Sequence, residues 1–521
     1  MMRERFYLTT AIFYPSERPA LHSMFEAIGA DAIARYHRLL GHDTRFLTGM
    51  DEHSANVERD AHERGIDPHQ LIDPWAATWQ ATFERFGISA DRFIRTTDAD
   101  HAKAAAEMVR RAQAAGDVYE GTYSGWYCTG CNEFKTDQQL VRGRCPDHPT
   151  LDPQWLEEHN YFFRLSAYQE RLEELYAGNP SFCEPEHFRN EVLGWLREGL
   201  RDFSISRSGT TWGIPFPGDE EHRIYVWFDA LTNYLTGAGF PSDQADMERW
   251  WPADLHVIGK NITRFHCLYW PAMLMSAGLP LPKQVFAHGF MLDRGEKMSK
   301  TAGNTSDPDT VADTFGVDGV RYVVLREVPF DRDADVTYDG LVRRYNADLA
   351  NDLGNLVNRT VSMSRRYREG SLPPVTSATQ PADDEVRAAA ERTVATYHAA
   401  MERHHLDEAL AAIMDLAGTA NGYAEGQAPW GLNKAGEVER VGQVLAVMAE
   451  VCRILGHLLA PVAPLGARTI LEQLGVPPPY DERGAGGPGL EELLAWGAPG
   501  TGLLTGVPTP IFPRIEAEAT V

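Results

Sequence analysis

Two pairs of metal-binding side chains lie close together near residue 140. Cys128 and Cys131 are separated by two residues, and after thirteen intervening residues Cys145 and His148 form a second pair with the same spacing. Each pair can sit on a short turn, so the two turns together supply four ligands for a tetrahedral Zn²⁺. Because four protein ligands leave no open position, we predict a structural zinc site; reduced thiols beside a chance histidine are the alternative.

A short basic segment could meet phosphate charge. It runs Lys297-Met298-Ser299-Lys300-Thr301 between Gly295 and Gly303, which places two ammonium groups on a flexible loop. Ammonium groups held in this way stabilise the negative charge that develops during phosphoryl chemistry. Taken alone, the segment is better interpreted as a solvated basic turn.

The composition limits the class of protein. The 521 residues carry 49 basic and 74 acidic side chains, a formal charge of −25, which argues against a surface that binds nucleic acid nonspecifically over its whole extent but leaves room for local basic patches. The 43% hydrophobic and 24% charged residues are typical of globular proteins. No apolar run reaches membrane-spanning length, and MMRERFYLTTAIFY lacks the features of a signal peptide. We therefore expect a cytoplasmic protein with no membrane segment.

The elements that must position these residues begin with a strand, a loop and a helix. Residues 5–14 are apolar and β-rich, residues 21–39 carry apolar side chains at helical spacing, and TRFLTGMDEH is a second β-rich run. This order predicts a parallel α/β layer of the nucleotide-binding type, with ligands at the carboxyl ends of the strands.

The α/β pattern is interrupted and later gives way to helices. Cysteines, turns and aromatic residues replace it between about 116 and 215, and it resumes at HRIYVWFDAL, DLHVIGK and QVFAHGF, so an insertion splits one nucleotide-binding fold. An apolar stripe over 338–368 and alanine-rich patterns such as 384–417 and 436–460 predict helices.

In combination, these motifs resemble the methionyl-tRNA synthetases, which are class I aminoacyl-tRNA synthetases, over nearly the whole chain. The matching segments occur in the family's order: TGMDEH, GWYCTGC, CPDH, EEHNYFFRLS, DFSISR, WGIP, YVWFDALTNYL, RFHCLYWPAML, KMSKT, NADLANDLGNLVNR and QAPW. The resemblance implies an α/β Rossmann-like catalytic core, split by a zinc-binding connective insertion and followed by an all-α anticodon-binding helical bundle. It implies ATP with Mg²⁺, methionine or a similar amino acid, and tRNA as ligands. The chain ends near PRIE, where family cores end without an added dimerisation module, so a monomer is expected.

The resemblance also implies a division of the chain. Residues 1–115 and 221–290 would form the two halves of the core and residues 116–220 the insertion. Residues 291–345 would carry the lysine loop and the stem-contact region, and residues 346–521 the anticodon-binding domain.

Site residues follow from the same resemblance. The amino-acid pocket would be formed by Asp51, which would hold the α-ammonium group, and by Ile12, Tyr14, Trp227, Ala230, Leu231, Tyr234, Phe265 and His266. Aromatic rings suit a polarizable thioether, although without the resemblance these residues would be assigned to the core. The catalytic residues would be Lys297 and Lys300, and the nucleotide would be bound by His22, Ser23, Asn261, Lys297, Ser299, Lys300 and Thr301. Asn355, Arg359 and Trp430 would read the anticodon through hydrogen bonds and stacking, and read without the resemblance they are a solvated helix face.

The sequence departs from the family where ATP would bind. The family's His-x-Gly-His motif is here Ala20-Leu21-His22-Ser23, so two imidazoles are lost and a histidine replaces the glycine that lets adenine lie against the backbone. Ser54 stands where the family has glycine, and Asn261 where it has aspartate. Since one lost transition-state donor can cost about 10²- to 10³-fold in rate, these changes predict weak adenylation or a rearranged ATP pose.

Three hypotheses follow. The first is ATP-dependent activation of methionine with transfer to tRNA. The second is a biosynthetic paralogue of the hydrazine synthetase type, which loads an aminoacyl group onto an N-hydroxylated amine and uses a separate cupin partner enzyme. The third is a catalytically impaired binder of amino acid or tRNA.

Overall fold

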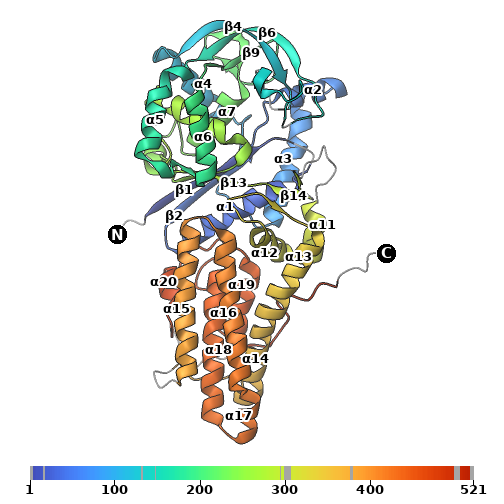
Figure 1. Cartoon of the computed structure of the whole chain (residues 1–521), viewed down its shortest axis with the longest axis vertical. Helices are drawn as coiled ribbons and strands as arrows, with labels where there is room; N and C mark the ends of the chain where they lie inside the picture. The colour runs from blue at the N-terminus through green and yellow to red at the C-terminus, as the bar shows by residue number, and fades with distance from the viewer. Residues whose placement is uncertain are drawn as a thin grey trace.

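A six-stranded parallel sheet lies at the centre of the catalytic part of the molecule (Figure 1). The computed structural model describes residues 4–15, 18–130, 133–135, 137–146, 148–293, 295–297, 307–375, 380–497 and 505–516. The strand order is β3 (Arg92–Arg95), β2 (Asp43–Met50), β1 (Arg5–Phe13), β12 (Leu255–Gly259), β13 (Val285–His288) and β7 (Cys183–Glu184), and all five pairings are parallel. The chain runs outward from β1 through β2 to β3 on one side and from β12 to β13 on the other, where the earlier strand β7 forms the edge. This reversal opens a crevice at the carboxyl ends of β1 and β12, as the sequence pattern predicts.

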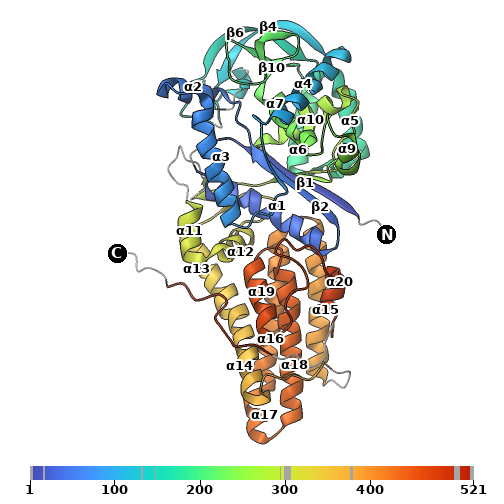
Figure 2. The ribbon, with the colours of Figure 1, turned by 180° about the vertical axis from the view of Figure 1, so that it is seen from behind.

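Helices cover both faces of the sheet. They are α1 (Leu21–Leu39), α2 (Ala55–Arg64), α3 (Pro68–Arg85), α4 (Ala99–Ala114), α7 (Val226–Leu231), α8 (Asn233–Thr236), α9 (Gln244–Trp250) and α10 (Trp270–Ser276). Helix α1 is buried over almost its whole length, including Asp31 and Arg35. It therefore lies between the sheet and the helical part of the chain rather than at the surface (Figure 2).

The predicted insertion separates the two halves of the sheet. It holds a four-stranded antiparallel sheet of β4 (Val118–Cys128), β5 (Glu133–Lys135), β6 (Gln154–Phe163) and β8 (Phe203–Ser204), and a three-stranded sheet of β9 (Ser206–Ser208), β10 (Pro215–Phe216) and β11 (Asp219–Ile224). Helices α5 (Gln169–Gly178) and α6 (Glu186–Glu198) accompany them. This part lies at the end of the molecule opposite the long helices (Figure 1).

The segment after β13 joins the sheet to the helical part. It forms β14 (Met291–Asp293), β15 (Glu296–Lys297), α11 (Pro308–Phe315), α12 (Val317–Glu327) and β16 (Ala334–Asp335). One continuous helical rod follows, made of α13 (Tyr338–Arg344), a π-helical segment (Tyr345–Gly354) and α14 (Asn355–Arg368). The predicted apolar stripe is confirmed, because Leu341, Tyr345, Leu349, Leu353 and Leu356 are all buried.

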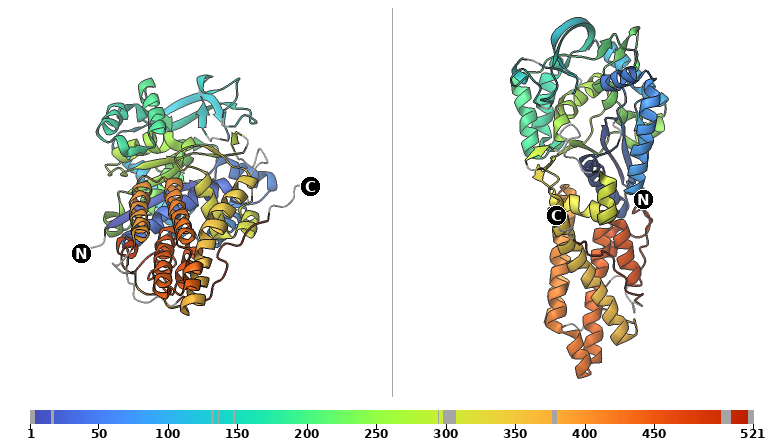
Figure 3. Two further views of the ribbon diagram at one scale, coloured as in Figure 1. Left: turned by 60° about the horizontal axis from the view of Figure 1, so that its bottom comes forward. Right: turned by 90° about the vertical axis from the view of Figure 1, so that its right-hand side faces the viewer.

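A helical bundle completes the chain (Figure 3). Its helices are α15 (Pro381–Glu402), α16 (Leu406–Gln427), α17 (Pro429–Ala435), α18 (Val438–Leu459), α19 (Pro464–Gln473) and α20 (Leu490–Leu494). The alanine-rich stretch 384–417 is two helices, because the chain turns at Arg403–His405, where His404 adopts a φ of +60°. Among the described helices, α18 alone has the length and apolar composition of a membrane span, and 94% of its most apolar window is buried inside the bundle.

Candidate active site

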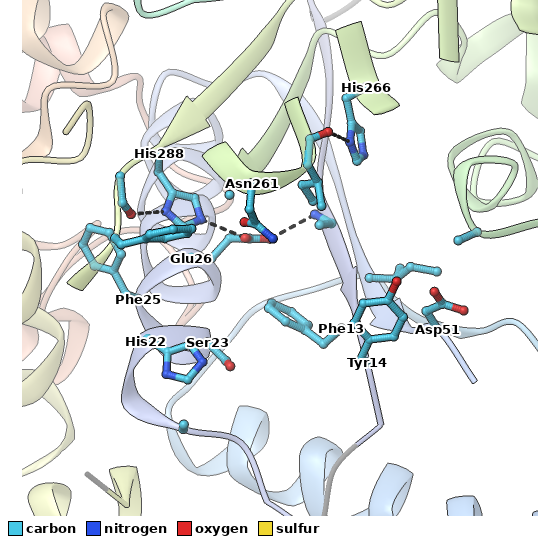
Figure 4. Close-up of a pocket in the computed structure, with 18 of the residues that line it drawn as sticks. Phe13, Tyr14, His22, Ser23, Phe25, Glu26, Asp51, Asn261, His266 and His288 are labelled. Carbon is cyan, nitrogen blue, oxygen red and sulfur yellow. Dashed lines mark hydrogen bonds and ion pairs between the residues drawn. The ribbon is translucent and has the colours of Figure 1, made fainter. Parts of the chain in front are cut away.

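A cavity of about 360 Å³ lies at the carboxyl ends of the central strands (Figure 4). Its walls come from the end of β1, the start of α1, Asp51 after β2, helices α7 and α8, and the residues that follow β12 and β13. The carboxyl ends of parallel strands meet at one edge of a sheet, so segments more than 200 residues apart converge on this cavity.

One half of the cavity is an apolar slot. The rings of Trp227 and Phe265 are stacked, with centroids 3.7 Å apart and planes inclined by 5°, and Tyr14 meets Trp227 edge-on at 6.4 Å. The slot is also lined by Ile12, Ala230, Leu231, Tyr234 and His266. The structure therefore brings together the predicted amino-acid-binding residues, and their roles in binding stay predictions.

The polar groups at the bottom of this slot are paired and uncharged. The Tyr234 hydroxyl lies 2.6 Å from Nε2 of His266, whose Nδ1 lies 3.0 Å from the carbonyl oxygen of Ile262. This geometry assigns the proton to Nδ1, which donates to Ile262, while Nε2 accepts from Tyr234. Burial lowers the pKa of His266 to about 4, so the imidazole is neutral at pH 7. An uncharged slot favours an apolar side chain over a charged one.

Asp51 lies at the mouth of the slot beside a buried cluster. Asp229 is fully buried and accepts from two imidazoles, His53 Nδ1 at 2.7 Å and His101 Nε2 at 2.6 Å. Burial opposes the charge on Asp229, but these imidazoles outweigh it and hold the pKa of that carboxyl below its usual range. For Asp51, by contrast, burial together with the charges of Asp229 and Glu52 raises the pKa well above the usual range. The ionised form of the Asp51 carboxylate would therefore be strongly stabilised by a cation that binds beside it.

Methionine binding is expected to weaken on acidification because of this raised pKa. In the predicted binding mode, the α-ammonium group of methionine binds the ionised form of Asp51. Because the pKa of Asp51 is raised, protons neutralise this carboxylate at a higher pH than they would an exposed carboxyl with a pKa near 4. Affinity should rise with pH until Asp51 is fully ionised and then level off. Tryptophan fluorescence titration, with Trp227 as reporter, measures the dissociation constant at each pH. Asp51→Asn should bind weakly and show no such slope; an equal slope in that variant would contradict the assignment.

The other half of the cavity begins at the first turn of α1. His22, Ser23 and Asn261 line it, and their role in nucleotide binding stays a prediction. Ala20 at the start of the helix offers no side-chain hydrogen bond to the first turn. The free backbone N–H groups of a helix N-terminus favour an anion. The main chain of Lys297 lies in β15, whereas Ser299, Lys300 and Thr301 lie outside the described residues. No lysine or arginine is among the described residues that line the cavity.

The sequence reasoning missed several residues of this half. Glu26 and His288 both line the cavity and form an ion pair, with 2.8 Å between Oε2 and Nε2 (Figure 4). Phe13 and Trp79 stack at 5.0 Å on another wall. The spacing of His22, Ser23 and Glu26 along one helix could have pointed to Glu26, because residues three and four apart share a helix face. No short-range sequence pattern connects Glu26 to His288.

The cysteine and histidine ligands come together in the insertion. The ligand atoms of Cys128, Cys145 and His148 lie within 4.8 Å of one another, and Cys131 lies outside the described residues. A Cβ on Gly130 would lie 2.4 Å from the His148 ring, so the turn needs glycine to let the imidazole approach. Two thiols and an imidazole on tight turns match the donor set of a structural zinc site.

The predicted anticodon-reading residues lie far from the cavity, toward the outer end of the bundle. Asn355 and Arg359 are one turn apart on α14, and the Arg359 guanidinium lies 5.9 Å from the ring centre of Trp430 on α17. Trp430 is 45% exposed.

Comparisons with known proteins agree with this arrangement. Residues 6–152 and 150–361 match the family model of the class I tRNA synthetases (M), and residues 373–519 match the anticodon binding domain of methionyl tRNA ligase. The chain is 42% identical to a methionine--tRNA ligase of Thermosynechococcus vestitus over 100% of this chain and 99% of that protein. It is 44% identical to one of Brucella suis over 99% of each. A structure of Mycobacterium tuberculosis methionyl-tRNA synthetase in complex with methionyl-adenylate superposes with a TM-score of 0.92 at 43% identity, over 98% of this chain and 100% of that one. The chain belongs to the methionyl-tRNA synthetase family.

Proposed function

We propose that this protein activates methionine with ATP and transfers the methionyl group to tRNA. A methionine carboxylate oxygen attacks the α-phosphorus of ATP and pyrophosphate leaves; the 3′-terminal hydroxyl oxygen of tRNA then attacks the carbonyl carbon and AMP leaves. The observation that supports this most is a single cavity that joins an apolar, Asp51-flanked slot to the N-terminus of α1, in a chain 43% identical to a synthetase solved with methionyl-adenylate.

In this proposal, each group of residues has a separate role in binding the substrates. Asp51 holds the ammonium group, so that the carboxylate points toward the nucleotide half, and Trp227 and Phe265 enclose the thioether. The N-terminus of α1 faces the phosphates, and Lys297 and Lys300 neutralise negative charge on the α-phosphate and the leaving pyrophosphate. Mg²⁺ bound with ATP would supply further positive charge there. Asn355, Arg359 and Trp430 bind the anticodon in the first turns of α14 and at α17.

Amino-acid-dependent ATP/pyrophosphate exchange tests the first step. We expect exchange with methionine and with none of the other nineteen standard amino acids, followed by acylation of tRNA that carries the methionine anticodon. Lys300→Ala should abolish both. Absence of exchange at high protein concentration, together with saturable methionine binding, would support the impaired binder instead.

The choice of acceptor separates the first two hypotheses. The relatives described above carry the name of a tRNA ligase, and residues 373–519 match an anticodon-binding model, which supports tRNA rather than an N-hydroxylated amine and a cupin partner. Acyl transfer to a small hydroxylamine without tRNA would reverse this choice. The five-part division of the chain, the monomeric state and the cytoplasmic location stay predictions.

We also propose that Cys128, Cys131, Cys145 and His148 hold one structural Zn²⁺. The purified protein should contain about one zinc per chain, because four protein ligands close the site. Cys145→Ala should lose the metal and lower the melting temperature. Cys452→Ala, which removes a buried thiol from α18, is the matched control and should keep the zinc. Elemental analysis by mass spectrometry measures the metal; undiminished zinc in Cys145→Ala would contradict the ligand assignment.

A further inference from the structure

Glu26 connects three elements at the nucleotide half of the cavity. It lies on α1 and is only 6% exposed. Its Oε1 accepts a hydrogen bond of 3.0 Å from the backbone N–H of Ala11, where the register between β1 and β2 shifts. Its Oε2 faces Nε2 of His288 at the end of β13, 2.8 Å away. One carboxylate therefore ties the first helix to strands from both halves of the core.

The His288 ring is held through both of its nitrogens. The second ring nitrogen, Nδ1, lies 2.8 Å from the carbonyl oxygen of Gly289. Each nitrogen therefore lies within hydrogen-bond distance of an oxygen, one on Glu26 and one on the main chain. Phe330 stacks on this ring at 5.5 Å and Phe25 meets it edge-on at 5.6 Å, which restricts its orientation.

The residues after His288 form a wall of the cavity. Gly289, Phe290 and Met291 all line it. The wall is held from the outside as well, because the backbone N–H of Phe290 donates to Asp333 at 2.8 Å and a Cβ on Gly289 would lie 2.0 Å from the main chain of Arg332. From the cavity side, the His288 ring and its partner Glu26 hold the first residue of the wall.

We propose that Glu26 is a positioning residue for the nucleotide: through His288 it sets the distance between the 289–291 wall and the first turn of α1. The proposal rests on the proposed function, because it assigns this half of the cavity to ATP. It follows that removing the carboxylate weakens ATP binding and leaves the methionine slot intact, since Trp227 and Phe265 stack on each other and the His266 ring is held by Tyr234 and Ile262. It also follows that nucleotide binding in this chain depends on the Glu26 carboxylate, because the altered residues at the start of α1 do not take over its role.

The test compares Glu26→Ala with Glu26→Gln. For Glu26→Ala we expect the KM for ATP in pyrophosphate exchange to rise about 10-fold or more, because small displacements at a binding wall cost large factors. The dissociation constant for methionine, measured by tryptophan fluorescence, should change less than about twofold, because the slot rings are held by one another and by Ile262 rather than by Glu26. Glu26→Gln keeps an acceptor for Ala11 and a polar partner for His288, so it should restore much of the ATP affinity.

Glu450→Gln is the matched control. Glu450 is buried and ion-paired with Arg453 within α18, far along the chain from the cavity, so both constants should stay unchanged. Hydrogen–deuterium exchange gives a readout that needs no turnover: in Glu26→Ala the 289–291 wall should exchange faster, while β12 should not.

The outcomes separate the two proposals. Suppose first that the unmodified protein catalyses exchange. An unchanged KM for ATP in Glu26→Ala, or equal losses of affinity for ATP and for methionine, would then overturn the role of Glu26 and leave the proposed function standing. No exchange in the unmodified protein would overturn the proposed function. In that case unaltered hydrogen exchange over 289–291 in Glu26→Ala would overturn the positioning role as well, and faster exchange there would support it.

Discussion

Replacement of Arg321 by methionine is expected to destabilise the folded chain by about 3–5 kcal/mol, because it removes one of the two guanidinium groups paired with the buried Asp31 and leaves three carbonyl oxygens without this donor. Arg321 lies on α12 and is completely buried. Its Nη2 pairs with Asp31 on α1 at 2.7 Å, and its nitrogens also donate to the carbonyl oxygens of Phe86, Pro461 and Val462 at 3.1, 3.2 and 2.6 Å. The side chain thus joins the catalytic core, the connecting helix and the bundle, and its loss should lower the melting temperature of all three.

Differential scanning calorimetry measures this effect. Arg85→Met is the control: Arg85 pairs with Asp309 and Asp313 at the surface, where solvent screens the charges, so its loss should barely move the transition. The double variant Asp31→Asn/Arg321→Met should lose less than the sum of the single changes, since it removes both charges of the pair. Equal melting temperatures for Arg321→Met and Arg85→Met would contradict the structural account.

Restoring the family's motif at the start of α1 is expected to raise adenylation. In the triple variant Ala20→His, His22→Gly and Ser23→His, two imidazoles return to the helix start and the side chain at residue 22 is removed. Since one transition-state donor contributes about 10²- to 10³-fold, exchange with methionine should rise by about 10²-fold if these departures are simple losses.

The rate of pyrophosphate exchange at low ATP measures the gain, and the dissociation constant for methionine serves as the internal control because the slot lies in the other half of the cavity. The single variants show which position matters. An unchanged or lower rate in the triple variant would mean that the nucleotide half has been rebuilt around other groups, with Glu26 and His288 as the first candidates.

The sequence predicts those features that local spacing or family motifs encode. The Cys128 and Cys145 pairs, the apolar stripe from Leu341 to Leu356 and the interrupted α/β pattern each have a short-range signature. The turn at His404 does not, because Arg403, His404 and His405 include no glycine or proline.

Long-range pairs escape the same reasoning for a physical reason. Glu26 and His288 are 262 residues apart, and Asp229 meets His53 across 176 residues. Such contacts arise only when the sheet order brings strand ends together, and no periodicity reports that order. The polar contacts that determine the protonation states of side chains in the cavity can therefore be identified only from the fold.

The helical rod from Tyr338 to Arg368 can act as a lever that pivots where it is fixed to α12. Its base is fixed where Asp348 accepts a hydrogen bond of 2.8 Å from Tyr322, and Arg359 lies further along it. At no more than about 1.5 Å per residue the arm from Asp348 to Arg359 measures about 16 Å at most, so a tilt of about 5° at the base would displace the tip by about 1 Å, more than a hydrogen bond tolerates. Substitutions around Asp348 should therefore change which anticodon bases are accepted by the predicted anticodon-reading residues.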